Sequence, residues 1–578
     1  MAEPPPTRKL TIIAKDPGLR LGGPAGPMAF TQVSVPAEIL APGPTGYRIK
    51  VVDYNATEQR GYVNNAAYQI DKDKLVDPFA PGPGEDLLDP AYQARLLANP
   101  NFHAQNAYAI AMRTLGMFER ALGRRVSWST GGHQLHIAPH AFAQANAFYS
   151  EPDRALMFGY FHRDDGTPVF TCLSHDIVAH ETTHALLDGL RSRYTQASGP
   201  DQAGFHEGFA DIVALLSIFS MKQVVAAAIG EDGKIRSGDQ EIPLVEPAKL
   251  KTKAIRNSII FGLACEVGRE LERGEHDALR RSVELTPKEG AVLRNADDEH
   301  ARGEVMAAAM MNAFLMLWAR RIETLGKFAN GQYNLDAVVE EGAALAGHLL
   351  TMAIRALDYC PPTDMDFGQY LAAMLTADSE VVPEDDRGYR KVIRRVFRSY
   401  GIVTPSSGCG RNGCWLRFRN AHQLTYSRSN YAAMTRNPEE MFRFLWENRG
   451  KLNISERAYT EVLSIDAASR IGPDGIAVHE TVCQYVQRFD LFGSEFRSVL
   501  GAERPDGMDT KMSFTAFGGG VVILDQYGQV KYHIANPIFG GERQRTRARY
   551  LLDTGRIGAE DMRDRLRFAV AHFDRMGA

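Results

Sequence analysis

At 578 residues the chain is longer than one hydrophobic core normally serves, so two or three domains are expected. Its 66 basic and 70 acidic residues nearly balance, which argues against nucleic acid or an anionic membrane as a partner. The N-terminal segment lacks the charged start and apolar core of a secretory signal, and the six scattered cysteines favour reduced thiols. We therefore expect a cytoplasmic protein.

Residues 1 to about 100 mix short β-like runs with proline and glycine, as in Ala80-Pro-Gly-Pro-Gly84. The two clearest runs are Leu10–Ala14 and Gly46–Asp53. We predict a β-rich N-terminal extension over 1–100. A remnant of a pro-segment, an edge extension of a catalytic sheet and a plain structural extension all remain open.

The segment 101–225 is predicted to be a β-rich lobe that also carries two functional helices. It opens with a helix over Phe102–Leu122, whose apolar residues recur on one stripe. Alternating runs then predict four strands, over Val126–Trp128, Gln134–Ile137, Ala155–Phe161 and Val169–Thr171. Three histidines on a stretch punctuated by glycine and proline are interpreted as structural or exposed: His133, His136 and His140.

Residues 174–190 contain a His-Glu-x-x-His motif. On an α-helix His180 and His184 are stacked one turn apart on the same face, so both imidazoles can reach one metal ion. Glu181 lies beside the open side of that ion, where it can act as a base. The alternative is a buried amphipathic helix with two hydrogen-bonded histidines, but burying these three polar groups without a purpose is costly.

The ends of this helix also have sequence signals. Ser174 is a candidate N-cap, and Asp176 places negative charge in the first turn, where it interacts favourably with the helix dipole. Gly189 is a candidate helix stop.

A second helix, predicted over 204–215, carries two carboxylates on one face. Glu207 can be the third ligand of a two-His, one-Glu zinc site that leaves a fourth position for water. Asp211, one turn later, can accept the second N–H of a ligand histidine and fix its tautomer. The alternative for Asp211, a surface or capping carboxylate, is disfavoured by its apolar neighbours.

Residues 226–405 are predicted to form a helical lobe, with a loop-rich insertion at 230–252. Its predicted helices are Ile255–Glu272, Val305–Arg320, Leu335–Ala356, Phe367–Thr376 and Tyr389–Tyr400. Residues 406–578 are expected to form an α+β accessory domain without a recognisable motif. There we predict helices at Phe442–Trp446 and Cys483–Phe492 and a hairpin over Val521–Ile534.

The stretch Asp176-Ile-Val-Ala-His-Glu-Thr-Thr-His-Ala-Leu-Leu-Asp188, followed by His206-Glu-Gly-Phe-Ala-Asp211, resembles the thermolysin-like zinc metallopeptidases. The resemblance runs over roughly 100–405. It implies an α+β, two-lobed catalytic domain with a β-rich N-terminal lobe, a helical C-terminal lobe and the zinc helix between them. It also implies one Zn²⁺ per chain.

The resemblance implies further roles by position. Asn146 and Ala147, before a predicted strand, look like the pair that holds the substrate backbone. Tyr194 and His300 are similar to the family's hydrogen-bond donors to the scissile carbonyl. Arg280 is similar to its substrate-positioning arginine, although the adjacent Arg281 fits equally well.

Two features depart from the family pattern. The spacing from His184 to Glu207 is a few residues longer than usual, which implies an enlarged loop. Ile218 stands where a calcium-binding glutamate is usual, and no acidic cluster follows it. Structural Ca²⁺ is therefore expected to be absent.

The leading hypothesis is a zinc endopeptidase that acts on peptides or proteins through a water activated by Glu181. Two alternatives stay open, a catalytically silent binding or assembly module and a hydrolase restricted to small peptides or amides. Neither a nucleic acid nor a membrane partner is expected, and oligomeric state is not addressed by the sequence.

Overall fold

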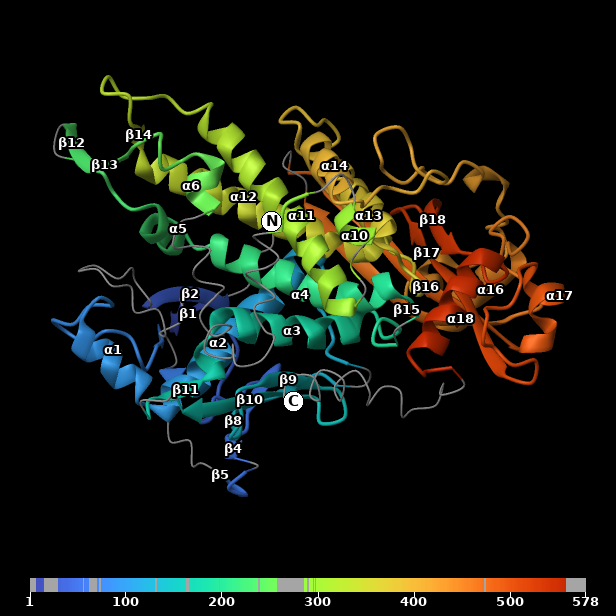
Figure 1. Ribbon diagram of the computed structural model, residues 1–578, viewed down its shortest axis with the longest axis horizontal. Helices are drawn as coiled ribbons and strands as arrows, with labels where there is room; N and C mark the ends of the chain where they lie inside the picture. The colour runs from blue at the N-terminus through green and yellow to red at the C-terminus, as the bar shows by residue number, and fades with distance from the viewer. Residues whose placement is uncertain are drawn as a thin grey trace.

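The computed structural model of the chain is a mixed α+β assembly, as expected (Figure 1). A β-rich part and a layer of long helices lie on either side of two adjacent helices, α3 and α4 (Figure 1). The residues that the structure describes are 7–14, 30–55, 57–61, 70–71, 74–129, 132–162, 166–196, 198–237, 240–256, 285–287, 291–294, 296, 298–471 and 475–557.

The β-rich part is built on a five-stranded sheet of order β11-β10-β8-β3, with β9 paired to β10. Strands β3, β8 and β10 are parallel, whereas β9 and β11 run antiparallel to β10. Because β3 comes from the first hundred residues, that segment supplies a strand of this sheet. The strands are β3 (Ile49–Val51), β8 (Leu135–Phe142), β9 (Ala147–Ser150), β10 (Ala155–His162) and β11 (Pro168–Phe170).

Long buried helix α2 (Pro100–Leu122) packs against this part of the protein, and Asn99 caps its start. The strand predicted over Val126–Trp128 is wrong: the segment pairs with none of the described strands, and the Trp128 indole donates to the Arg48 carbonyl. The smaller elements of this region are β1 (Thr7–Ile13), β2 (Phe30–Pro36), β4 (Tyr54–Asn55), β5 (Arg60–Gly61), β6 (Ile70–Asp71), β7 (Lys74–Leu75) and α1 (Pro90–Leu97).

Helices α3 (His175–Leu190) and α4 (Pro200–Phe219) pack on each other, and α4 packs in turn on α11 (Glu299–Ile322). Helices α11 and α12 (Leu335–Arg355) are long and apolar enough to cross a membrane, but most of each lies buried within the protein. Here they are core helices. The remaining helices among the described residues before 405 are η1 (Thr171–Leu173), α5 (Lys222–Ile229), α6 (Thr252–Arg256), α10 (Ala291–Arg294), η2 (Ala356–Tyr359), α13 (Phe367–Ser379) and α14 (Tyr389–Ser399).

The insertion at 230–252 is more regular than predicted. It contains the hairpin of β12 (Gly233–Ser237) and β13 (Gln240–Val245), and β13 also pairs with β14 (Tyr333–Asn334). Most of the helix predicted over Ile255–Glu272 lies outside the described residues.

The C-terminal region is built on a four-stranded antiparallel sheet in sequence order, β15 (Tyr459–Ile471), β16 (Ala477–Phe492), β17 (Ser513–Leu524) and β18 (Val530–Asn536). The hairpin predicted over Val521–Ile534 is confirmed, but the helix predicted over Cys483–Phe492 is wrong. That segment lies in the central strand β16, and its first half is buried on both faces, so this half lacks the alternation that identifies a half-exposed strand. The helices here are η3 (Ala421–Gln423), α15 (Tyr431–Met434), α16 (Pro438–Glu447), η4 (Gly493–Glu495), α17 (Phe496–Leu500) and α18 (Gly541–Asp553).

The C-terminal sheet shares the main hydrophobic core of the protein. Val482, Val521 and Ile523 belong to the same buried cluster as the helices of the preceding region. Asn536 on β18 also accepts a hydrogen bond from the Gln369 amide of α13, at 2.8 Å. The domain boundaries drawn from the sequence stay a prediction, and the core is continuous across the boundary at 405.

Candidate metal and active site

The predicted ligands come together at the contact between α3 and α4. His180 and His184 lie one turn apart on α3, with their Nε2 atoms 2.9 Å from each other. Glu207 of α4 faces both, with its Oε2 atom 3.5 Å from His180 Nε2 and its Oε1 atom 3.8 Å from His184 Nε2. Two imidazole nitrogens and a carboxylate thus converge on one point, the donor set of a zinc centre with an open position.

The tautomer of His180 supports this interpretation. Its Nδ1–H donates to Asp211 Oδ1 at 2.9 Å, so Nε2 is the ring nitrogen that faces the cluster. Burial lowers the pKa of His180, but hydrogen bonds from its ring to Asp211 and Glu207 more than offset this and raise the pKa well above its ordinary value. A metal ion must therefore displace a proton, so we expect metal affinity to rise with pH.

His206 is a second neighbour of the cluster that the sequence did not reveal as functional. Its Nδ1 lies 2.9 Å from His184 Nδ1, and the two rings are stacked at 5.1 Å. When His184 binds metal through Nε2, its Nδ1 carries the proton and donates to His206. His206 immediately precedes the ligand Glu207 on α4, which is the signal that could have identified it.

Glu181 lies beside the ligands and is 3% exposed. A carboxylate oxygen of Glu181 and one ring nitrogen each of His180 and His184 all lie within 4.8 Å of one another. This is the position required of a base that faces the open side of the metal.

Helix α11 brings His300 to the same cluster because three glycines let it approach α4 closely. A Cβ on Gly208 would lie 2.5 Å from the Gly303 carbonyl oxygen, and a Cβ on Gly303 would lie 2.9 Å from the Gly204 carbonyl oxygen. At this crossing His300 Nδ1 is 3.7 Å from Glu207 Oε2, and its side chain is 38% exposed. His300 therefore stands at the open side of the site, where it can reach a ligand.

An ion pair between two largely buried side chains holds the starts of α11 and α4 together. The Arg302 Nε–H on α11 donates to Asp201 Oδ1 in the first turn of α4, at 2.9 Å. Asp201 Oδ2 also accepts the Phe367 backbone N–H at 3.1 Å. The Arg302-Gly303 pair thus positions His300 both by charge and by close packing.

The start and end of α3 differ in detail from the sequence signals. Ser174 is the N-cap residue, but its hydroxyl donates to Asp176 and makes no capping bond to the backbone. The helix continues through Gly189 to Leu190. Glycine is required at 189 because a Cβ there would lie 2.1 Å from the Ser127 carbonyl oxygen.

Strand β9, which begins at Ala147, supplies the edge expected beside the site, since among the described strands it pairs only with β10. Asn146 is buried, and its Oδ1 accepts the Ala147 N–H at 2.7 Å. The Tyr149 hydroxyl on the same strand donates to Asp188 Oδ2 of α3 at 2.8 Å, which fixes the strand against the motif helix.

Tyr194 does not occupy the position that the resemblance implies. Its side chain is 1% exposed, and its hydroxyl donates to the Pro361 carbonyl at 2.7 Å. We therefore correct its predicted role as a donor to substrate, because this buried hydroxyl already donates to a backbone carbonyl in the core. Arg280 and Arg281 lie outside the described residues.

Replacing Asp211 with alanine is expected to weaken zinc binding by ~10–100-fold, since the His180 ring loses the acceptor that fixes its tautomer. A competition titration against a chelating dye measures this effect. Ser217→Ala on the same helix is the matched control, because that hydroxyl bonds only to the Ala214 carbonyl among its recorded contacts. Equal affinity in the Asp211 variant and the control would contradict the assigned role.

Comparison with known proteins agrees with this geometry. Residues 50–188 match the family described as thermolysin metallopeptidase, catalytic domain. The match starts within β3, earlier than the resemblance inferred from the motifs, and includes Asn146 and the His-Glu-x-x-His motif, but it ends before Glu207. A search among curated proteins gives no match. Over this segment the chain is therefore similar to the thermolysin metallopeptidase catalytic domain, and a further C-terminal region follows the helices that contain the site.

Proposed function

We propose that the chain is a zinc-dependent peptidase that hydrolyses peptide bonds. The observation that carries the proposal is the position of Glu181, whose carboxylate lies beside the converging His180, His184 and Glu207 side chains. A protein that only bound a metal would have no use for a buried base at this point. For this reason we favour an active enzyme over a silent binding module.

The donor set fits Zn²⁺. Both histidines direct a ring nitrogen to one point, and Glu207 adds a carboxylate oxygen within 4 Å of each nitrogen. Two neutral imidazoles and one carboxylate leave the ion a net positive charge. A zinc ion held there supplies Lewis acidity toward the scissile carbonyl and toward water.

The protein's own residues account for the remaining steps. Glu181 accepts the proton of the attacking water and passes it to the leaving nitrogen. The exposed imidazole of His300 donates a hydrogen bond to the oxygen that becomes negative. The edge of β9 that faces away from β10, its one partner among the described strands, holds the substrate backbone extended from Ala147 onward.

The test is hydrolysis of an unfolded, casein-like protein by the full chain before and after removal of metal. We expect chelation to abolish cleavage and one equivalent of Zn²⁺ per active site to restore it. Cleavage that persists in protein shown to be free of metal would contradict the proposal.

A specific contact favours a narrower alternative, a peptidase restricted to short substrates. The Tyr550 hydroxyl on α18 donates to Glu299, the residue before His300, and Arg556 Nη1 lies 3.2 Å from the same carboxylate. The C-terminal region thus contacts the start of α11 at the open side of the site. Cleavage of short peptides but not of unfolded proteins would support this alternative.

A further inference from the structure

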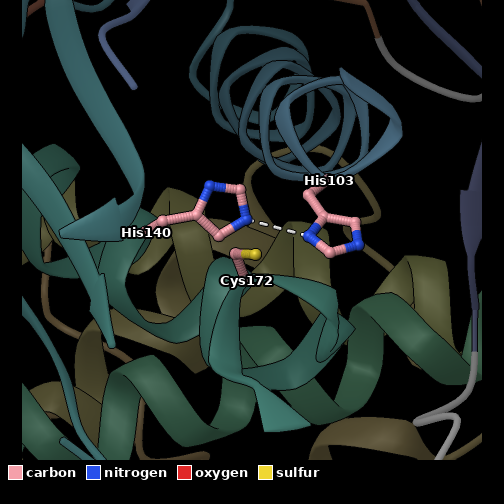
Figure 2. A group of neighbouring side chains, drawn as sticks. All are labelled: His103, His140 and Cys172. Carbon is pink, nitrogen blue, oxygen red and sulfur yellow. Dashed lines mark hydrogen bonds between the residues drawn. The ribbon is translucent and has the colours of Figure 1, made fainter. Parts of the chain in front are cut away.

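A second group of metal-binding side chains lies outside the site described above. His103 on α2, His140 on β8 and Cys172 in η1 are 2%, 4% and 0% exposed. Figure 2 shows the two imidazole rings facing each other, with the Cys172 thiol beside them. One ligand atom from each of the three residues lies within 4.8 Å of the other two.

The two rings face each other through nitrogens that carry no proton, because the other nitrogen of each neutral ring is the one that donates. His103 Nε2 lies 2.8 Å from the Leu97 carbonyl oxygen, and His140 Nδ1 lies 2.8 Å from Asp53 Oδ1. A carbonyl and a carboxylate only accept, so both outer nitrogens are N–H donors. His103 Nδ1 and His140 Nε2 then face each other with lone pairs, at 2.9 Å.

Such a contact is repulsive unless a metal ion or an additional proton stands between the two nitrogens. The His180–His184 pair shows the same geometry, with the same 2.9 Å separation and an outer nitrogen that donates to a carboxylate. Two Zn–N bonds of about 2.0–2.1 Å at a tetrahedral angle place the nitrogens about 3.3 Å apart, so a small side-chain shift accommodates an ion.

We propose that His103, His140 and Cys172 hold a second metal ion, distinct from the one at His180. The proposal does not depend on the proposed peptidase activity. A thiolate with two imidazoles suits a borderline or soft ion such as Zn²⁺, and it does not suit Ca²⁺ or Mg²⁺. On binding, the metal–sulfur bond replaces the Cys172 S–H bond and the proton leaves to solvent.

Neighbouring groups hold each ligand in place. Asp53 orients His140 as the carboxylate of a carboxylate–histidine–metal arrangement. Asn106, on the helix that carries His103, donates to the Cys172 carbonyl at 2.9 Å and accepts the Ile13 N–H at 2.8 Å. The Phe170 ring packs on both imidazoles, with centroids 4.7 Å from His103 and 5.3 Å from His140, and helps to exclude water.

The location indicates a structural role. Strand β8 belongs to the main sheet, α2 packs on that sheet, and Cys172 lies in the turn directly before α3. An ion bound to all three would fasten the start of the motif helix to the β-rich part. Burial of all three ligands means that the ion is acquired as the chain folds.

Cobalt substitution tests the site directly. The His180 group contains no cysteine, so a thiolate-to-Co²⁺ charge-transfer band in the near ultraviolet reports coordination by a thiol outside that group. We expect the Co²⁺-loaded full chain to show the band, also when His180 and His184 are both changed to alanine. Zinc-loaded wild type is expected to contain two ions per chain.

Two matched variants assign the signal to one thiol. Cys172→Ala should lose the band and one of the two ions, whereas Cys483→Ala, at an equally buried cysteine of β16, should keep both. Wild-type protein without the band and with one ion per chain would overturn the proposal. In that case an additional proton on His140, shared with His103, explains the short contact. The absence of the band from the wild-type spectrum overturns the proposal even when a variant fails to fold.

Discussion

Replacing Glu181 with glutamine is expected to lower kcat/KM for peptide hydrolysis by ~10²–10⁴-fold, the usual contribution of general acid–base catalysis. Glutamine keeps the size of the side chain but cannot accept the proton of water. Because Glu181 is not one of the three converging ligands, zinc binding should stay close to one equivalent at this site.

Zinc content and cleavage rate should be measured on the same preparations of wild type and Glu181→Gln. Glu542→Gln makes the same change of charge at an exposed side chain of α18 and is the matched control, with activity expected to equal that of wild type. A Glu181 variant that binds zinc and keeps more than a tenth of the activity would show that another group is the base.

The second large effect is expected at a buried ion network that joins the catalytic region to the C-terminal sheet. Asp358 in η2 is fully buried and accepts two hydrogen bonds from Arg124, at 2.8 and 2.7 Å. It also accepts from Arg470 of β15, which in turn donates to Glu480 of β16. The network therefore links three distant parts of the chain around one carboxylate.

Changing Asp358 to asparagine is expected to destabilise the protein by about 3–5 kcal/mol, because it leaves the buried arginines without their shared counter-charge. Burial raises the pKa of Asp358, but Arg124 and Arg470 outweigh burial and bring it from 3.8 to about 2. Because the pKa of this carboxyl is lower in the folded protein than in the unfolded chain, its contribution to stability is fully present at pH values above the unfolded-state pKa. This stabilisation should therefore be lost as pH falls from about 4 to about 2.

Urea unfolding of the two proteins at neutral pH measures the difference. The control is Asp553→Asn, which breaks the exposed pair with Arg549 on α18 and should change stability by about 0–1 kcal/mol. A shift of the Asp358 variant no larger than that of the control would show that the network contributes little.

The sequence predicted the parts of the site that are local. The i, i+4 spacing of His180 and His184 places both rings on one helix face whatever surrounds the helix, and Glu207 and Asp211 have the same relation on α4. His300 lies close to Glu207 because the glycine at 303 permits the helix crossing, and its role as a donor to substrate stays a prediction.

What the sequence could not predict depends on tertiary contacts. Tyr194 points into the core because the Pro361 carbonyl, far along the chain, accepts its hydroxyl. Cys483–Phe492 has an apolar pattern that fits a helix, and only its two strand neighbours make it β. The pairing of His140 with His103 joins a strand to a helix distant in sequence, so no spacing rule reveals it.

The central claim is a zinc centre between α3 and α4, and anomalous diffraction at the zinc absorption edge tests it most directly. We predict a peak about 2.0–2.2 Å from His180 Nε2, His184 Nε2 and a Glu207 carboxylate oxygen in crystals of the zinc-loaded chain. A map with no peak at this point, from protein shown to contain zinc, would contradict the account.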